Sequence, residues 1–549
     1  MPKDLPVRLF AALLCALSLA ACGPGESNVE RGNREGVLHF GNGTEPQELD
    51  PHIVTGVPEH NIISALLEGL VAKDPRTLEP VPAVAERWEV SADGLTWRFH
   101  LREAARWSNG DPVTAHDFVW SWRRALLPEL GNQYAYMLFP IAGAEAFHRG
   151  ELKDFSQVGV KALDEHTLEV KLRHPTPYFL QLLDHYATFP VHRPTIERFG
   201  APGERGTPWT RPGHYVGNGP FVLVGWRLNK VIEVRKNPYY WDADRVALQG
   251  VDFRPVENVS TEERMFRAGQ LHMTQTVPID KLAWYRAHHP EMLQVSPYLG
   301  TYYYRLNVRH PVLADARVRR ALALAVDRKA LVDHVTRGGE VPAFSFTPPG
   351  IPGYRPPAAL RYDPQEARRL LAEAGYPEGQ GFPRLSLLYN TSEGHQKIAV
   401  ALQQMWKREL GVEIALDNQD WKVFLNSVAL GQYEIARAGW IGDYVDPMSF
   451  LDLWVTDGGN NQTGWSNPHY DELVLQRAVR TSDATERFRL LAAAERILLE
   501  EAPIIPLYFY TSKRLVHPSV VGVYPNLLAY VSWKDVRLRA TVSSPPTGR

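Results

Sequence analysis

Residues 437–450 read Arg-Ala-Gly-Trp-Ile-Gly-Asp-Tyr-Val-Asp-Pro-Met-Ser-Phe, and this stretch decides how the rest of the chain is interpreted. The residues around its start, 432–438, predict a short strand that leads into a loop. Gly439 and Gly442 allow the backbone to come close to another group there. Pro447 lacks an amide donor, so it ends any strand and opens the next segment.

The same stretch places opposite charges at a short spacing. Arg437 and Asp443 enclose Trp440 and open backbone within seven positions. This set suits a zwitterion with a flat backbone, whose amino group would pair with Asp443 and whose carboxylate would pair with Arg437. The alternative is an ordinary strand with one salt-bridged Asp and one surface Arg. Spacing alone favours that alternative, because short motifs often match by chance.

Composition places the chain among globular proteins with more than one core. It has 549 residues, of which 44% are hydrophobic and 22% are charged. Such a length exceeds what a single core holds. The net charge of −2 provides no basic field, so no nucleic-acid partner is expected. The 15 Trp and 23 Tyr suit binding surfaces as well as cores.

The N-terminus predicts export. A basic start is followed by an apolar run at 9–20 that is too short to span a bilayer as a permanent helix. Leu19-Ala20-Ala21-Cys22 then resembles a bacterial lipoprotein signal, in which residues 1–21 are removed and Cys22 becomes the lipidated first residue. The alternative is an ordinary secretory peptide cut at an Ala-x-Ala-like site.

Cysteine usage agrees with a lipoprotein. Cys15 and Cys22 are the only cysteines, and the first lies in the predicted signal peptide while the second would carry lipid. The mature chain would therefore contain no disulfide, although its compartment would permit one. Residues 22–34 are expected to form a flexible tether and 542–549 a loose tail. No other run is long enough for a transmembrane helix, so a soluble body held at a membrane by its lipid is expected.

The remaining pattern predicts a mixed α/β chain whose strand-helix units recur in separated blocks. Two or three domains that interrupt one another are expected, with a cleft between them as the ligand site. A helix from Thr114 should carry a capping box with Asp117. Strands are expected at 36–41, 88–90, 95–101, 217–235, 251–256, 301–307, 385–389, 412–416 and 504–510, with a hairpin at 158–172, and further helices at 61–70, 316–327, 364–374, 396–410 and 482–501.

Motifs of catalysis are absent from the sequence. It contains no Gly-x-Ser-x-Gly elbow, no His-Glu-x-x-His pair, no Walker loop and no Gly-x-Gly-x-x-Gly. Residues 457–461 suggest a calcium loop but lack the ligand spacing and closing Glu, so they are read as a turn. A dispersed triad leaves no such motif. Even so, no enzyme, metal or cofactor is expected.

Six blocks together resemble one family. The chain is similar to the periplasmic oligopeptide-binding proteins of ABC importers, the dipeptide/oligopeptide solute-binding group. The blocks run in family order over nearly the whole mature chain, at 49–52 (Leu-Asp-Pro-His), 56–59 (Gly-Val-Pro-Glu), 107–115 (Trp-Ser-Asn-Gly-Asp-Pro-Val-Thr-Ala), 301–304 (Thr-Tyr-Tyr-Tyr), 389–392 (Tyr-Asn-Thr-Ser) and 436–444 (Ala-Arg-Ala-Gly-Trp-Ile-Gly-Asp-Tyr).

The resemblance implies an α/β, two-lobed periplasmic-binding-protein fold of the cluster C type, with three interleaved domains and a hinged ligand cleft. Two lobes would close on an extended peptide, which lies as an added strand, so that main-chain hydrogen bonds give affinity whatever the side chains. The implied domains are I at 35–67, 193–299 and 511–541, II at 68–192, and III at 300–510.

The resemblance also assigns site residues. Asp443 matches the carboxylate that pairs with the α-ammonium of the ligand, and Arg437 and His395 match groups that receive its carboxylate. A surface position at a helix start is the alternative for His395, and plain core is the alternative for the aromatic residues. Backbone contacts are implied at Gly439 and Ile441 from one lobe and Thr55 and Val57 from the other, and pocket positions at Tyr134, Tyr298, Asn390, Trp421 and Trp440.

Two departures from the enteric members concern this site. Their disulfide maps to Gly300 and Ile441, so it is absent here, and their Lys maps to Thr336 with Arg337 beside it. The second departure puts the binding of the longest peptides in doubt. The lipoprotein signal is a further difference and predicts a tethered receptor.

These observations predict a monomeric, membrane-anchored lipoprotein of the periplasm or cell envelope. It would capture short peptides with a free amino terminus and deliver them to the permease and ATPase subunits of an ABC importer. A receptor of the same family for murein peptides or another small solute is the first alternative. A secreted hydrolase and a surface scaffold are the others.

Overall fold

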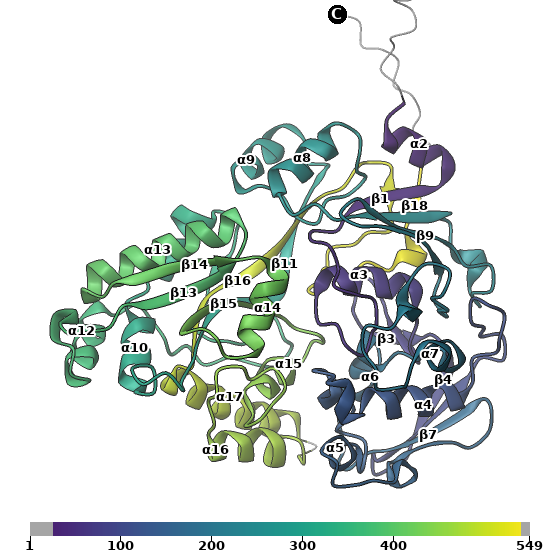
Figure 1. The fold of residues 1–549 in the computed structure, drawn as a ribbon, viewed down its shortest axis with the longest axis horizontal. Coiled ribbons are helices and arrows are strands. Elements are labelled where there is room, and N and C mark those ends of the chain that lie inside the picture. The colour runs from purple at the N-terminus through teal and green to yellow at the C-terminus, as the bar shows by residue number, and fades with distance from the viewer. Residues whose placement is uncertain (1–25, 482, 540–549) are drawn as a thin grey trace, which may run out of the picture.

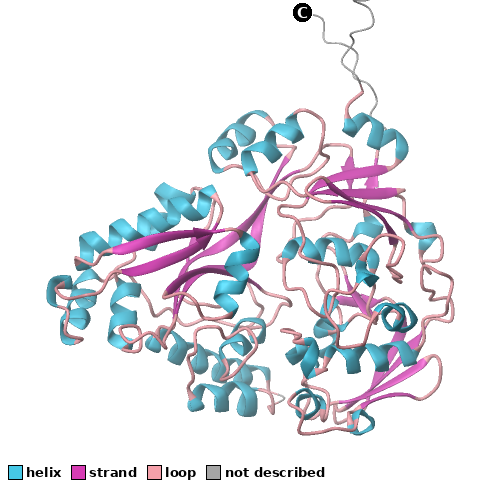
Figure 2. Cartoon of the chain, viewed as in Figure 1, coloured by secondary structure: helices cyan, strands magenta, loops and turns pink. Residues whose placement is uncertain are grey.

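The computed structural model describes residues 26–481 and 483–539 (Figure 1). The predicted signal peptide at 1–21, the lipidation site Cys22 and the tail at 542–549 therefore lie outside the described residues. Figure 1 shows the chain folded into two parts side by side, one green and one purple to blue. Figure 2 shows strands and helices in both parts, as a mixed α/β fold requires. None of the described helices is long and apolar enough to cross a membrane.

The first sheet combines segments far apart in the sequence. Its order is β1-β10-β9-β8, and β1 pairs with β10 in parallel while the other neighbours are antiparallel. The chain leaves this sheet after β1 and returns to it at β8, about 180 residues later. Residues 42–220 therefore form a segment inserted between two neighbouring parts of this sheet, called the inserted segment below. The strands are β1 (Val37–Gly41), β8 (Phe221–Arg227), β9 (Val231–Lys236) and β10 (Gly250–Arg254).

The second sheet lies within the inserted segment and is built from two hairpins. Its order is β4-β5-β7-β6, antiparallel throughout, and it confirms the strands predicted at 88–90 and 95–101 and the hairpin predicted at 158–172. The predicted capping box is also present, because the Asp117 carboxylate accepts the Thr114 N–H at 2.7 Å. The strands are β4 (Ala85–Val90), β5 (Thr96–Leu101), β6 (Val160–Ala162) and β7 (Thr167–Lys171).

The third sheet has the order β12-β16-β11-β15-β13-β14. Its β13 and β14 run parallel on either side of helix α13 (Glu393–Leu410) in the sequence, which confirms the strands predicted at 385–389 and 412–416 and the helix predicted between them at 396–410. Figure 1 shows β11 and β16 running together from beneath α8 (Val259–Arg267) and α9 (Ile279–His288) into the green part. The strands are β11 (Leu293–Leu306), β12 (Val341–Pro342), β13 (Leu385–Asn390), β14 (Ile414–Gln419), β15 (Ile435–Ile441) and β16 (Ile504–Leu515).

The described chain also contains α- and π-helices, several short 3-10 helices and two small ribbons. The ribbons are β2 (Val71–Lys73) with β3 (Pro80–Pro82) and β17 (Val520–Val521) with β18 (Arg537–Leu538). The helices are α2 (Asn28–Glu35), α3 (Val57–Leu66), α4 (Ala115–Ala125), α5 (Ala144–His148), α6 (Phe179–Leu182), α7 (Arg193–Phe199), α8 (Val259–Arg267), α9 (Ile279–His288), α10 (Ala316–Leu324), α11 (Arg328–Ala330), the π-helix η7 (Leu331–Thr336), α12 (Pro364–Glu373), α13 (Glu393–Leu410), α14 (Trp421–Ala429), α15 (Met448–Leu451), α16 (Pro468–Asp471), the π-helix η10 (Glu472–Ala478) and α17 (Ala484–Glu501).

The prediction of a flexible tether over 22–34 is wrong from residue 28 on, where α2 begins. Ser27 and Glu30 form a capping box, since each side chain accepts the backbone N–H of the other, at 3.2 and 2.8 Å. Val29 is 4% exposed and its N–H donates to the Gly269 carbonyl at 2.8 Å. One apolar anchor and a good cap therefore fix a segment whose composition is that of a linker.

Two boundaries near the site also differ from the prediction. Helix α3 begins at Val57 rather than at residue 61, because Pro58 suits the first turn of a helix. Strand β15 continues to Ile441 rather than ending near Ala438, because β11 pairs with it up to Gly300. The loop predicted for Gly439 and Ile441 is thus strand.

Candidate functional site

One edge of β15 is open where it approaches Asp443. On its first edge β15 pairs with β11 from Ile435 to Ile441. On its second edge β13 pairs with it only at Ile435 and Ala436. Past Ala436, no strand of the described sheet occupies this second edge.

The ladder with β11 shows which residues face the open edge. The Gly442 N–H donates to the Leu299 carbonyl at 2.7 Å, and the Asn307 N–H donates to the Glu434 carbonyl at 2.9 Å. Because hydrogen-bonded pairs alternate in an antiparallel ladder, the even-numbered residues of β15 bond to β11. The odd-numbered ones direct both backbone groups the other way. Beyond the two residues that pair with β13, the odd-numbered residues of β15 are 437, 439 and 441, and they face the open edge.

Asp443 stands at one end of this open edge and lacks a cation. Its side chain is 11% exposed, and its Oδ1 lies 3.4 Å from Nε2 of His185. Burial lowers the pKa of His185, which keeps that imidazole neutral. Within the described chain, Oδ2 of Asp443 is buried without a hydrogen-bond partner. The loop itself is fixed, because the Asp443 N–H donates to Oγ of Ser449 at 2.7 Å.

The neighbouring lysine does not compensate this charge. Lys73 forms a buried ion pair with Asp184, the residue before His185. Burial raises the pKa of Asp184 to about 6, and the charge of Asp443 adds to the increase. The Asp443 carboxylate is therefore a buried anion that favours a positively charged group beside it.

Arg437 stands at the other end of the edge and lacks an anion. Its guanidinium donates to the Tyr510 hydroxyl at 3.0 Å and lies 4.8 Å from the centre of the Tyr302 ring. The Asn390 Oδ1 is a longer contact at 3.5 Å. No carboxylate of the described residues lies within 4.0 Å of it, and its Nε is buried without a partner. The site thus holds an uncompensated cation and an uncompensated anion at its two ends.

His395 lies at the first turn of α13 beside Arg437. Its Nδ1 is 3.2 Å from the Tyr302 hydroxyl, and burial, with the charge of Arg437, lowers its pKa well below the usual value. The ring is therefore neutral. If the Tyr302 hydroxyl donates to Nδ1, the neutral imidazole carries its proton on Nε2, where it can donate to a ligand.

The segment around Thr55 and Val57 reaches the site from the other part of the molecule. Gly56 between them is extended (φ −96°, ψ 151°) and precedes α3. The Tyr186 hydroxyl donates to the Val54 carbonyl at 3.0 Å, and the His60 ring lies 5.4 Å from that of Tyr186. Since His185 contacts Asp443, this places the segment beside the Asp443 end of the edge.

The other predicted residues separate into a close group and an outlier. Tyr134 lies 4.6 Å from His185 and 6.4 Å from Trp440, measured between ring centres. Tyr298 lies 6.2 Å from Tyr510. Trp421 is apart, because it stacks on Phe424 at 5.9 Å and packs on a separate small apolar cluster. Among the described residues, Trp421 makes no hydrogen bond or ring contact with the other predicted site residues, and its role stays a prediction.

Contacts between the inserted segment and the loop that carries Asp443 join the two parts of the molecule. Tyr178 stacks on Tyr444 with ring centres 5.3 Å apart and planes 6° from parallel. Arg487 lies 4.9 Å from the Tyr178 ring and makes two hydrogen bonds to Asp446, at 2.8 and 2.7 Å. The inserted segment thus packs on the loop that carries Asp443. Elsewhere, no group of three or more metal-ligating side chains was found among the described residues.

Sequence reasoning missed the residues that complete the site. His185 lies in the inserted segment and Tyr510 in β16, far from Asp443 and Arg437 in the sequence. Neither lies in a block that carries the resemblance. The sequence offered one signal, the spacing of Tyr508 and Tyr510 in the predicted strand 504–510. Residues two positions apart in a strand lie on the same face, so both rings are expected on one face of the sheet.

Comparison with known proteins then decides the class of site. Residues 79–462 match the model of bacterial extracellular solute-binding proteins, family 5. The chain belongs to this family. It is 40% identical over 529 residues to the periplasmic oligopeptide-binding protein OppA of Salmonella typhimurium, covering 95% of each chain. As a member of this family, the chain studied is a solute-binding receptor rather than an enzyme.

Solved structures confirm the two-lobed fold. The complex of Haemophilus influenzae OppA with RPPGFSPFR matches with a TM-score of 0.87 at 35% identity, covering 92% of this chain and 99% of that one. The murein tripeptide-binding protein MppA of Escherichia coli also matches at 0.87, with 37% identity, covering 91% and 98%. The unliganded open form of MppA gives 0.65 at the same identity, covering 92% and 97%. The lobes of this chain therefore differ from the open arrangement, in agreement with the stacking of Tyr178 on Tyr444.

Proposed function

We propose that this solute-binding protein captures short peptides with free termini as an added strand on the open edge of β15. The observation that carries the proposal is the pair of uncompensated charges at the ends of that edge. Asp443 would take the α-ammonium, and Arg437 with His395 would take the carboxylate. A zwitterion of matching length satisfies both ends at once, whereas other solutes leave one charge buried and unpaired.

The backbone of the peptide would pair with Gly439 and Ile441. With its amino end at Asp443, the peptide runs antiparallel to β15 and exchanges main-chain hydrogen bonds that are independent of side chains. Gly439 has no room for a side chain there, since a Cβ would lie 2.5 Å from the Tyr510 hydroxyl. Thr55 and Val57 would contribute backbone contacts from the opposite lobe.

Closure would follow from contacts that a peptide makes with both lobes at once. The hinge is assigned to β11 and β16, which connect the parts. The domain boundaries given above, near 35–67, 193–299 and 511–541 for I, 68–192 for II and 300–510 for III, belong to this proposal. Tyr134, Tyr298, Asn390, Trp421 and Trp440 would line pockets wet enough to accept varied side chains.

The cellular role follows from the resemblance and from the N-terminal sequence. The mature chain would be a monomer anchored through lipid on Cys22 in the cell envelope, where it delivers peptides to an ABC permease and its ATPase. This part rests on sequence outside the described residues.

Native mass spectrometry of the mature chain, purified gently in mild detergent, tests the proposal. We expect retained masses of short peptides that a pool of di- to pentapeptides displaces, and their loss in Asp443→Ala. A single non-peptide mass would keep the fold and change the ligand, and a murein peptide would be recognised by its amino-sugar or diamino-acid mass. Binding of no peptide at all would overturn the proposal.

A further inference from the structure

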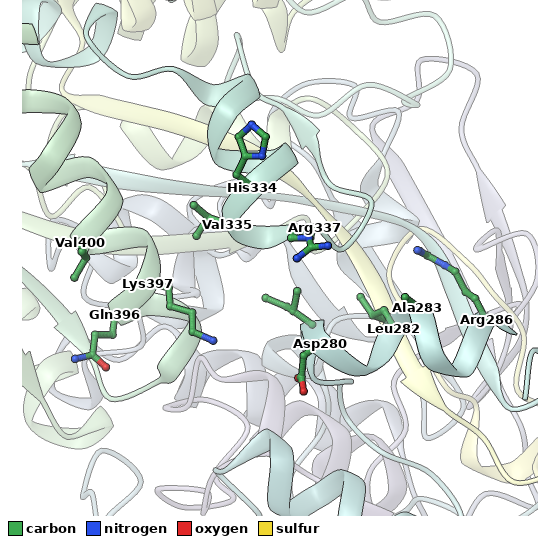
Figure 3. A pocket seen from close by; sticks show the side chains of 11 residues that line it. Asp280, Leu282, Ala283, Arg286, His334, Val335, Arg337, Gln396, Lys397 and Val400 are labelled. Carbon is green, nitrogen blue, oxygen red and sulfur yellow. The ribbon is translucent and has the colours of Figure 1, made fainter. Parts of the chain in front are cut away.

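A groove of about 810 Å³ lies between the two parts of the chain that β11 and β16 connect. Helix α9 forms one wall, and η7 with the start of α13 forms the other (Figure 3). None of the site residues described above lines it. It is lined by Ile279, Asp280, Leu282, Ala283, Arg286, His334, Val335, Arg337, Gln396, Lys397 and Val400.

The groove is positively charged. In Figure 3 the side chain of Arg337 lies between those of Lys397 and Arg286. None of these three has a carboxylate within 4.0 Å among the described residues, whereas Asp280, the one acid of the lining, is 3.8 Å from Lys281. Three free cations on facing walls favour an anionic occupant.

Backbone geometry turns Arg337 toward this groove and Thr336 away from it. Thr336 is 3% exposed, and its hydroxyl donates to Glu340 at 2.9 Å. Arg337 is exposed and adopts the left-handed conformation (φ 52°), with its N–H bonded to the Val332 carbonyl at 2.9 Å. A non-glycine residue in this conformation ends a π-helix, and both features are costly and concentrate at functional sites.

The sheet directs a long peptide out of the cleft on this side. A peptide antiparallel to β15 reaches Arg437 after roughly 20 Å, at about 3.3 Å per residue from Asp443. It cannot continue along the edge, because β13 pairs there with Ile435 and Ala436. The first turn of α13 lies beside Arg437 on this side, and it carries His395 and then Gln396 and Lys397 of the groove.

We propose that this groove binds the carboxyl-terminal part of peptides longer than about six residues and prefers acidic residues there. The inference rests on the proposed function and extends it to a ligand class. Arg286, Arg337 and Lys397 would pair with Glu or Asp side chains and with the terminal carboxylate. Thr336 takes no part because it is buried and bonded to Glu340.

Matched peptides test the proposal by calorimetric titration of the mature chain. The peptides are Ala-Ala-Ala and two octapeptides. Both octapeptides begin with five Ala, and one ends in three Glu whereas the other ends in three Gln. We expect the wild-type chain to bind the Glu octapeptide about three- to tenfold more tightly than the Gln one, as partly exposed ion pairs do. High salt should remove the difference.

Variants locate the effect. The double substitution Arg337→Ala with Lys397→Ala should abolish the preference for Glu and leave Ala-Ala-Ala binding unchanged. Arg384→Ala is the control, because this exposed residue precedes the opposite end of β13. Equal binding of the two octapeptides would overturn the proposal that the groove binds acidic residues, and so would a preference for Glu that survives the double substitution. In either case, binding of Ala-Ala-Ala would still support the proposed function. Failure of every peptide to bind would overturn both.

Discussion

Asp443→Asn should remove most of the affinity for peptides. Asn has the shape of Asp but no charge, so the variant leaves the incoming α-ammonium without a partner. The loop should stay in place, because its anchor to Ser449 uses the backbone N–H of residue 443. The Asp443 side chain is 11% exposed, and the His185 ring beside it is neutral, so His185 supplies no charge that could pair with an ammonium in its place.

The magnitude follows from burial. Removing one partner of a buried ion pair costs about 3–5 kcal/mol, because the remaining charge is desolvated and unpaired. Because the Asp443 side chain is 11% exposed rather than fully buried, the expected cost lies near the lower end of this range. We therefore expect a loss on the order of 3 kcal/mol, or roughly a hundredfold in Kd.

A double-mutant cycle isolates this interaction from other effects. The second change is made in the ligand, where propionyl-Ala-Ala replaces Ala-Ala-Ala and so removes the ammonium without adding bulk. Titration calorimetry of both proteins with both ligands gives the coupling energy. We expect about 2–3 kcal/mol of coupling, since each single change breaks the same pair.

A coupling near zero would refute the reasoning. It would mean that the ammonium binds elsewhere, even if Asp443→Asn weakened binding through the loop. Unchanged affinity of the Asn variant for Ala-Ala-Ala would refute it more simply.

Further predictions concern stability and anchoring. Burial raises the pKa of Glu262 from 4.5 to about 8, so the folded chain holds this proton more tightly than the unfolded chain does. The wild type should therefore lose stability relative to Glu262→Gln as pH rises from 4.5 to about 8. Urea unfolding of both proteins at several pH values measures this difference in stability. A flat difference would contradict this. Asp50→Asn should lower the urea midpoint by the equivalent of about 3–5 kcal/mol, because Arg124, 1% exposed at its side chain, loses its ion pair; an unchanged midpoint would show that the pair is dispensable. Cys22→Ser should release the protein from membranes on fractionation, and persistent membrane association would argue against the lipoprotein signal.

Local pattern was enough for elements that form from their own residues. The alternation at 95–101 gave a strand, and Thr114 with Asp117 gave a helix start, because both depend on neighbours in the sequence. Residues 28–34 were misjudged for the opposite reason. Their helix depends on Val29 docking on residue 269, which no local pattern announces.

The site could be predicted only in part for the same reason. Arg437 and Asp443 stand out locally as a closely spaced pair of charges. Their lack of compensation depends on His185, Tyr302 and Tyr510, which tertiary structure brings from other segments. The extension of β15 to Ile441 likewise depends on β11, so the open edge became visible only in the folded chain.

Hydrogen exchange at β15 tests most directly the claim that a peptide binds as an added strand. The amides of Gly439 and Ile441 face the open edge, whereas those of Ala438 and Trp440 already bond to β11 by the alternation of the ladder. With saturating Ala-Ala-Ala and residue-resolved mass spectrometry, we expect exchange to slow strongly at 439 and 441 and to change little at 438 and 440. Full occupancy without any change at 439 and 441 would contradict the account.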